Sequence, residues 1–175
     1  PFGRNVIGFL PGSSKRHRDS YVIVMAHYDG LGTLNGVLYP GADSNASGVV
    51  SMISIAEMFS SMRHLGRAYG SNLIFVALDA KSGSMKGSRA LWKMISDGLL
   101  QDPVSGKAID PAQIGMVVNI DQIGGTMSTL KSGRRDFIIM LGREAAGQEN
   151  SGLLSLCNLK YGSGLELSYD YYGSK

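Results

Sequence analysis

The chain has 175 residues, of which 43% are hydrophobic and 18% are charged, and its formal net charge is +3. This composition excludes a disordered chain and suits the core of one domain. The weak positive charge does not by itself indicate a nucleic-acid partner. The basic clusters at 15–18 and 131–135 are not interleaved with aromatic side chains, so we expect no nucleic-acid partner. The apolar runs are all much shorter than a membrane span, so no transmembrane segment is expected in this stretch.

Strand and helix patterns alternate along the chain. In chain order we expect strands at 4–12 and 21–27, a helix at 45–64, a strand at 72–79, a helix at 86–97, strands at 115–121 and 136–142, a helix at 145–159 and a strand at 165–172. This alternation predicts an α/β fold, a three-layer α/β/α sandwich around a mostly parallel mixed sheet.

Burial patterns refine this expectation. The strands at 21–27, 72–79 and 115–121 are apolar at both parities, which predicts burial on both faces of the sheet. The helix at 45–64 is expected to bury one face, made of Val49, Met52, Ile53, Ala56 and Phe59.

Polar residues follow each of the three strong strands. They are His27, Asp29, Asp79, Lys81 and Asp121. Because parallel strands end at one edge of a sheet, these side chains are expected to surround a cleft covered by the loop at 40–48. The alternative is that they only cap the strands.

Four motifs at these strand ends are similar to those of the M28 family of zinc exopeptidases. They read HYD at 27–29, GADSNASG at 41–48, FVALDAKSGSMKGS at 75–88 and NIDQIG at 119–124. The resemblance implies a mixed sheet between helices, two zinc ions at the strand ends and removal of N-terminal residues from peptides. It identifies residues 1–175 as a single peptidase-like domain, interpreted as a fragment of a longer chain whose last strands are absent. The resemblance alone would place the protein in a secreted, periplasmic or luminal compartment.

Part of the family's metal site is matched. The resemblance makes His27 and Asp121 candidate zinc ligands, and it makes Asp29 the carboxylate that orients His27 from behind. Other positions depart from the family. Ser44 stands where an aspartate would bridge the metals, Lys81 stands at the general-base glutamate, and Ser82 stands at a ligand glutamate. Asp43 lies beside the bridging position and is a weaker metal candidate.

These departures argue against catalysis. Two protein ligands do not make a catalytic zinc site, which needs three and a water molecule, and an ammonium has no lone pair to serve as a base. Our hypothesis is that Lys81 is a built-in cation of the cleft that pairs with Asp121, Asp43 or Asp79. The alternative is that Lys81 points to solvent.

The leading interpretation is a pseudo-peptidase of the nicalin and nicastrin type, a binding or structural module that needs no cofactor. Its cleft could hold a peptide or protein terminus, with Asp121 and Asp43 suited to an amine and Lys81 suited to a carboxylate. The first alternative is an active zinc aminopeptidase in which Asp43 replaces the lost bridge. The second is a single-zinc enzyme similar to glutaminyl cyclases. The sequence leaves the partner and the oligomeric state open.

Overall fold

A computed structural model describes residues 2–67, 69–125, 133, 137–139 and 143–168 of the chain. The chain divides into two compact units, Pro1–Gly124 and Gly125–Lys175, which are described separately. The single domain expected over residues 1–175 stays a prediction.

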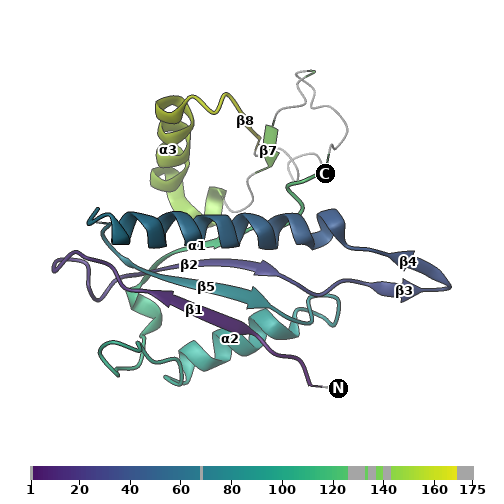
Figure 1. Ribbon diagram of the computed structural model, residues 1–175, viewed down its shortest axis with the longest axis horizontal. Helices are drawn as coiled ribbons and strands as arrows, with labels where there is room; N and C mark the ends of the chain where they lie inside the picture. The colour runs from purple at the N-terminus through teal and green to yellow at the C-terminus, as the bar shows by residue number, and fades with distance from the viewer. Residues whose placement is uncertain (1, 68, 126–132, 134–136, 140–142, 169–175) are drawn as a thin grey trace. The chain divides into compact units, whose positions relative to one another are not determined.

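The first unit is built on a four-stranded sheet (Figure 1). Its strands are β1 (Val6–Leu10), β5 (Asn72–Leu78), β2 (Tyr21–His27) and β6 (Ile114–Asn119), in that order across the sheet. β2 runs parallel to both β5 and β6, whereas β1 is antiparallel to β5. The sheet is therefore mixed and mostly parallel, as the sequence predicts.

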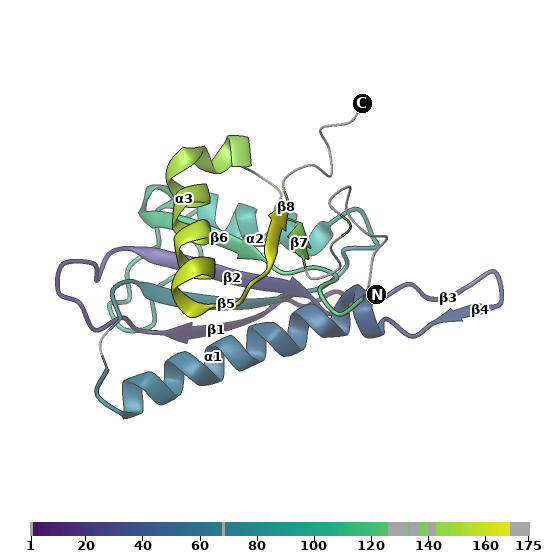
Figure 2. The same cartoon turned by 90° about the horizontal axis from the view of Figure 1, so that it is seen from above.

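Two helices cover the two faces of this sheet (Figures 1 and 2). They are α1 (Gly48–His64) and α2 (Lys86–Ser96). On the α2 side, Leu91 and Ile95 pack with Ile74 and Val76 of β5, while on the α1 side Met52 packs with Phe75 and other residues. Alternate residues of β5 thus point to opposite faces of the sheet and pack against different helices, which explains why the strand is apolar at both parities. The expected three-layer α/β/α arrangement is confirmed in this unit.

Two burial predictions are wrong. Ile53 is 48% exposed, because it lies one residue beyond Met52 and so turns toward the side of α1 that faces away from the sheet. In β6, Val117 is 52% exposed and Val118 is 36% exposed. β6 is the last strand of this four-stranded sheet, and edge strands bury less of their surface than central ones.

A two-stranded hairpin precedes α1 and projects from the sheet layer of this unit (Figure 1). It consists of β3 (Gly32–Leu34) and β4 (Val37–Tyr39), joined by Asn35 and Gly36, whose φ angles of 51° and 78° are both positive. Asn-Gly is the dipeptide that two-residue hairpin turns prefer. The irregular helical turn η1 (Ala42–Ser47) connects the hairpin to α1, and a short 3₁₀ helix, η2 (Pro111–Gln113), precedes β6.

The second unit contains α3 (Arg143–Tyr161) and a parallel pair of strands, β7 (Phe137–Ile139) and β8 (Glu166–Ser168). These elements confirm the helix expected at 145–159 and the first halves of the last two expected strands. Of the remaining residues in those strand candidates, Leu165 is described and lies outside the strand, while 136, 140–142 and 169–172 lie outside the described residues. Within the described ranges, none of the α-helices has the combined length and apolar character of a membrane-spanning segment.

Candidate functional site

The ends of three parallel strands bring the candidate residues of the first unit to one edge of the sheet. His27 is the last residue of β2, Asp79 directly follows β5, and Asp121 comes two residues after β6. Ala80 then takes a left-handed conformation with φ of 54°, which turns the chain sharply and places Lys81 at the same edge.

Asp121 joins two of the candidate residues through its two carboxylate oxygens. Its Oδ1 lies 3.3 Å from His27 Nε2, and its Oδ2 accepts a hydrogen bond of 2.8 Å from Lys81 Nζ. The His27 side chain is 7% exposed, whereas the side chains of Lys81 and Asp121 are 35% and 30% exposed. The ion pair expected for Lys81 is therefore formed with Asp121, and it is open to solvent.

Asp29 contacts His27 and also holds the loop that carries Lys81. Its backbone carbonyl lies 3.0 Å from His27 Nδ1, and its carboxylate Oδ1 lies 3.4 Å from the same atom. The carboxylate accepts hydrogen bonds from the backbone N–H groups of Lys81 and Ser82, at 3.0 and 3.1 Å. Burial raises the pKa of the Asp29 carboxyl, but these hydrogen bonds to its charged form outweigh burial, so the pKa is lowered. Asp29 thus contacts His27 and links the β2 and β5 loops.

Two other aspartates of the expected cleft bind backbone groups instead of Lys81. Asp79 accepts hydrogen bonds from Arg4 N at 2.9 Å and Ala80 N at 2.7 Å, and it does not line the pocket described below. Asp43 accepts from Gly124 N at 2.7 Å and from the Ser47 hydroxyl at 3.1 Å. Both carboxylates therefore stabilise loops at the strand ends.

A residue that the sequence analysis did not single out, Asn45, organises this edge. It is 2% exposed, and its amide donates to the carbonyls of His27 and Ile120 while its Oδ1 accepts from Gly48 N and Gln122 N. A Cβ on Gly48 would come within 2.4 Å of Asn45 Oδ1 and 2.6 Å of the Ile120 carbonyl oxygen, so only glycine fits there. The GADSN motif contained the signal, since a buried Asn must find partners for both ends of its amide.

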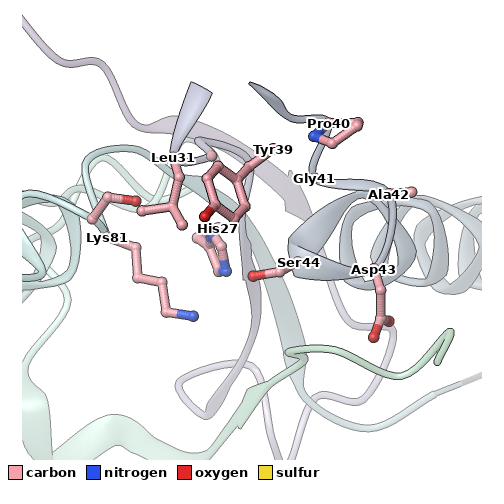
Figure 3. Close-up of a pocket in the computed structure, with 11 residues that line it drawn as sticks. His27, Leu31, Tyr39, Pro40, Gly41, Ala42, Asp43, Ser44 and Lys81 are labelled. Carbon is pink, nitrogen blue, oxygen red and sulfur yellow. The ribbon is translucent and has the colours of Figure 1, made fainter. Parts of the chain in front are cut away.

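A pocket of about 390 Å³ opens at this edge (Figure 3). It is lined by His27, Gly30, Leu31, Tyr39, Pro40, Gly41, Ala42, Asp43, Ser44, Lys81 and Ser82. Figure 3 shows the His27 ring, the Ser44 hydroxyl and the Lys81 amine directed toward one space, while the Asp43 carboxylate points away from them. The pocket therefore brings together one retained position of the family motifs, His27, and the three substituted positions, Ser44, Lys81 and Ser82.

The hairpin supplies a wall that the sequence analysis missed. Leu31 and Tyr39 stand at its base and line the pocket beside Pro40. The signal for this wall was the Asn35-Gly36 pair between two short apolar runs, which is a strong local indication of a hairpin.

The described residues do not fit the two-zinc site of the family. No three His, Cys, Asp or Glu side chains among them gather closely enough to hold an ion. His27 and Asp121 could provide two donors, but the Asp121 oxygens already face His27 Nε2 and the Lys81 ammonium.

Comparison with known proteins places the chain in a family. The model of peptidase family M28 matches residues 5–158, so the chain belongs to peptidase family M28. It is similar to nicalin, namely BOS complex subunit ncln of Danio rerio, with 34% identity over 103 residues, and BOS complex subunit NCLN of Gallus gallus, with 34% identity over 89 residues. These matches cover 56% and 48% of this chain but only 18% and 16% of the two relatives. The expected resemblance to M28 peptidases and to nicalin is confirmed.

Proposed function

We propose that this M28 peptidase-like domain does not cleave peptides and instead serves as a binding or structural module. The observation that carries the proposal is the ion pair of 2.8 Å between Lys81 and Asp121. In the motif comparison Lys81 stands at the general-base position and Asp121 at a zinc-ligand position. A resident ammonium at this place supplies the positive charge that a metal would otherwise supply.

The charge balance of the site supports this proposal. Carboxylates clustered without a metal repel one another, at a cost of about 4 kcal/mol per pair at 4 Å and an effective dielectric constant near 20. Replacing acids with Ser44, Ser82 and Lys81 makes the site about four charge units more positive, which matches the charge of two divalent ions. A domain without zinc would need such substitutions to keep the strand ends together.

The same substitutions remove the chemistry of hydrolysis. Attack on a peptide bond needs a base to take a proton from water, and the Lys81 ammonium has no lone pair for it. In the alternative of a rearranged zinc site, Asp43 would have to bridge the metals. That would require its carboxylate to give up Gly124 N and Ser47 and to turn toward His27.

The proposed partners are proteins. The two relatives are named as subunits of the BOS complex. By analogy we propose that this domain also works as part of a protein assembly, and that the first unit contributes binding surface instead of catalysis.

Metal content and turnover test the proposal together. The chain purified without chelators should contain no stoichiometric zinc by elemental analysis and should not hydrolyse aminoacyl-nitroanilides when zinc is added. The triple variant Ser44→Asp, Lys81→Glu and Ser82→Glu restores the acids of the family motif and should gain zinc affinity. A control with the same charge change at exposed positions, Ser54→Asp, Ser96→Glu and Lys107→Glu, should not.

Two outcomes would contradict the proposal. One is stoichiometric zinc in the unmodified chain together with turnover that a chelator abolishes. The other is loss of that turnover in a Lys81→Met variant, which would make Lys81 part of an active site.

A further inference from the structure

Hydrogen-bond donors with spare capacity face the pocket beside Lys81. The Lys81 ammonium has three N–H groups and donates one of them to Asp121, while its side chain lines the pocket. Ser44 and Tyr39 also line the pocket, and each carries a hydroxyl group that can donate a hydrogen bond. In Figure 3 the Ser44 hydroxyl and the Lys81 amine are directed toward the same space. A ligand with acceptor oxygens would meet these donors.

The carboxylates nearest to Lys81 already have protein partners on both oxygens. Both oxygens of Asp121 face His27 and Lys81, and both oxygens of Asp29 accept backbone N–H groups. Asp43 bonds to Gly124 N and points away from His27 and Lys81 (Figure 3). A ligand ammonium next to Lys81 would share the Asp121 carboxylate with the resident Lys81 ammonium, a like charge, whereas a ligand carboxylate would meet the remaining N–H groups of Lys81.

The wall of the pocket favours a ligand that has an apolar side chain next to its carboxylate group. Leu31 is 57% exposed and Tyr39 is 43% exposed, and the lining also includes Pro40 and Ala42. The whole stretch 30–42 carries no charged residue. A volume of about 390 Å³ is at the small end of ligand pockets, which suits one or two residues at a chain end better than a segment passing through.

We infer that this pocket binds the C-terminal carboxylate of a peptide or protein chain whose last residues are apolar. Lys81 pairs with the carboxylate, and the base of the hairpin covers the apolar side chain. The inference rests on the proposed function, because Lys81 is available to a ligand only where it takes the place of a metal. It also reverses the polarity that the M28 resemblance implies, namely recognition of a chain's amino end.

Calorimetry with four matched peptides tests this inference. The probes are acetyl-Ala-Leu-Leu with a free carboxylate, the same peptide as its amide, Ala-Leu-Leu amide with a free amine, and acetyl-Ala-Glu-Leu amide with its acid on a side chain. The free-carboxylate peptide should bind, and the other three should bind at least about tenfold more weakly, because each lacks a charge-assisted hydrogen bond at the chain end.

Variants assign the preference to the pocket. Lys81→Met should lower the affinity for the free-carboxylate peptide to that for its amide, whereas Lys93→Met, which removes an exposed lysine of α2 paired with Asp97, should leave the preference unchanged. Leu31→Asp alters an exposed side chain on the wall and should weaken binding of the acid more than binding of the amide. It keeps the test valid if Lys81→Met does not fold.

Several outcomes would overturn the inference: equal binding of acid and amide, preference for the free amine, equal binding of the side-chain acid, or no binding of any peptide at millimolar concentration. Zinc content and turnover are measured on the same samples. A zinc-free, inactive chain without carboxylate preference refutes this inference alone, whereas stoichiometric zinc with turnover refutes the proposed function first.

Discussion

The two ends of β2 carry similar polar groups in very different surroundings. At its start, Tyr21 donates a hydrogen bond of 2.7 Å to Asp102 Oδ2, and these residues are 3% and 4% exposed. At its end, His27 lies 3.3 Å from Asp121 Oδ1, but the Asp121 side chain is 30% exposed and its other oxygen binds Lys81. Each end thus joins a residue of the central strand to an aspartate from a distant loop.

The two ends of β2 differ in how many hydrogen bonds their aspartates accept and in how deeply they are buried. Besides Tyr21, Asp102 accepts hydrogen bonds from Val104 N and Ser105 N, at 2.7 and 2.9 Å. Burial raises the pKa of the Asp102 carboxyl, but these hydrogen bonds lower it by a larger amount, so the pKa is lowered overall. Burial and the contact with Asp102 raise the pKa of the Tyr21 hydroxyl. The buried Tyr21–Asp102 pair contributes stability, whereas at the open end the Lys81 ammonium keeps N–H groups that a ligand can use. The comparison teaches that solvent access, more than residue type, decides which of the two is structural.

The largest effect is expected at the closed end. Asp102→Ala removes three hydrogen bonds and leaves the Tyr21 hydroxyl buried without its acceptor, so the free energy of unfolding should fall by about 2–4 kcal/mol. Urea denaturation followed by circular dichroism measures it.

Tyr21→Phe is the matched control for that change. It removes one hydrogen bond but keeps the ring and the turn at Asp102, so it should cost about 1 kcal/mol. If Asp102→Ala cost no more than Tyr21→Phe, the backbone hydrogen bonds of Asp102 would contribute nothing, and the contrast between the ends of β2 would fail.

An intermediate effect is expected at Asp29, which is more sheltered than Asp121. Asp29→Asn keeps one acceptor oxygen but presents an NH₂ group to the second backbone N–H, so the variant should lose about 1–2 kcal/mol of stability near neutral pH. Denaturation curves of both proteins across pH measure the loss.

The pH dependence of this loss has a definite sign. The folded-state pKa of Asp29 is lowered, so its contribution is present above the unfolded-state pKa and disappears as the pH falls through the folded value. The stability difference between the two proteins should be steady between about pH 5 and 7 and should shrink below about pH 4. A difference that grew on acidification would mean that Asp29 is not the group held in its charged form.

Much of this arrangement could be predicted from the sequence because it depends on short-range pattern. The alternation of strands and helices, together with the polar residues that end β2, β5 and β6, located His27, Lys81 and Asp121 at one edge. Parallel strands leave no other place for residues that follow their C-terminal ends.

The remaining features depend on contacts between distant residues. The choice of Asp121 over Asp43 and Asp79 as the partner of Lys81 follows from Arg4 N and Gly124 N, which bind the other two carboxylates from far along the chain. The exposure of Val117 follows from the position of β6 at the edge of the sheet, which composition does not specify.

The smallest effect on stability is expected at the open end, where the proposed function is located. Ion pairs exposed to solvent contribute about 0–1 kcal/mol, so Lys81→Met should change the free energy of unfolding by no more than about 1 kcal/mol, although it should abolish the carboxylate preference of the pocket. A double-mutant cycle with Asp121→Asn isolates the pair, and its coupling energy should be below about 1 kcal/mol. A coupling of several kcal/mol would give this pair the structural weight expected of the Tyr21–Asp102 pair. The Lys81 ammonium would then be a fixed part of the fold instead of a group available to a ligand.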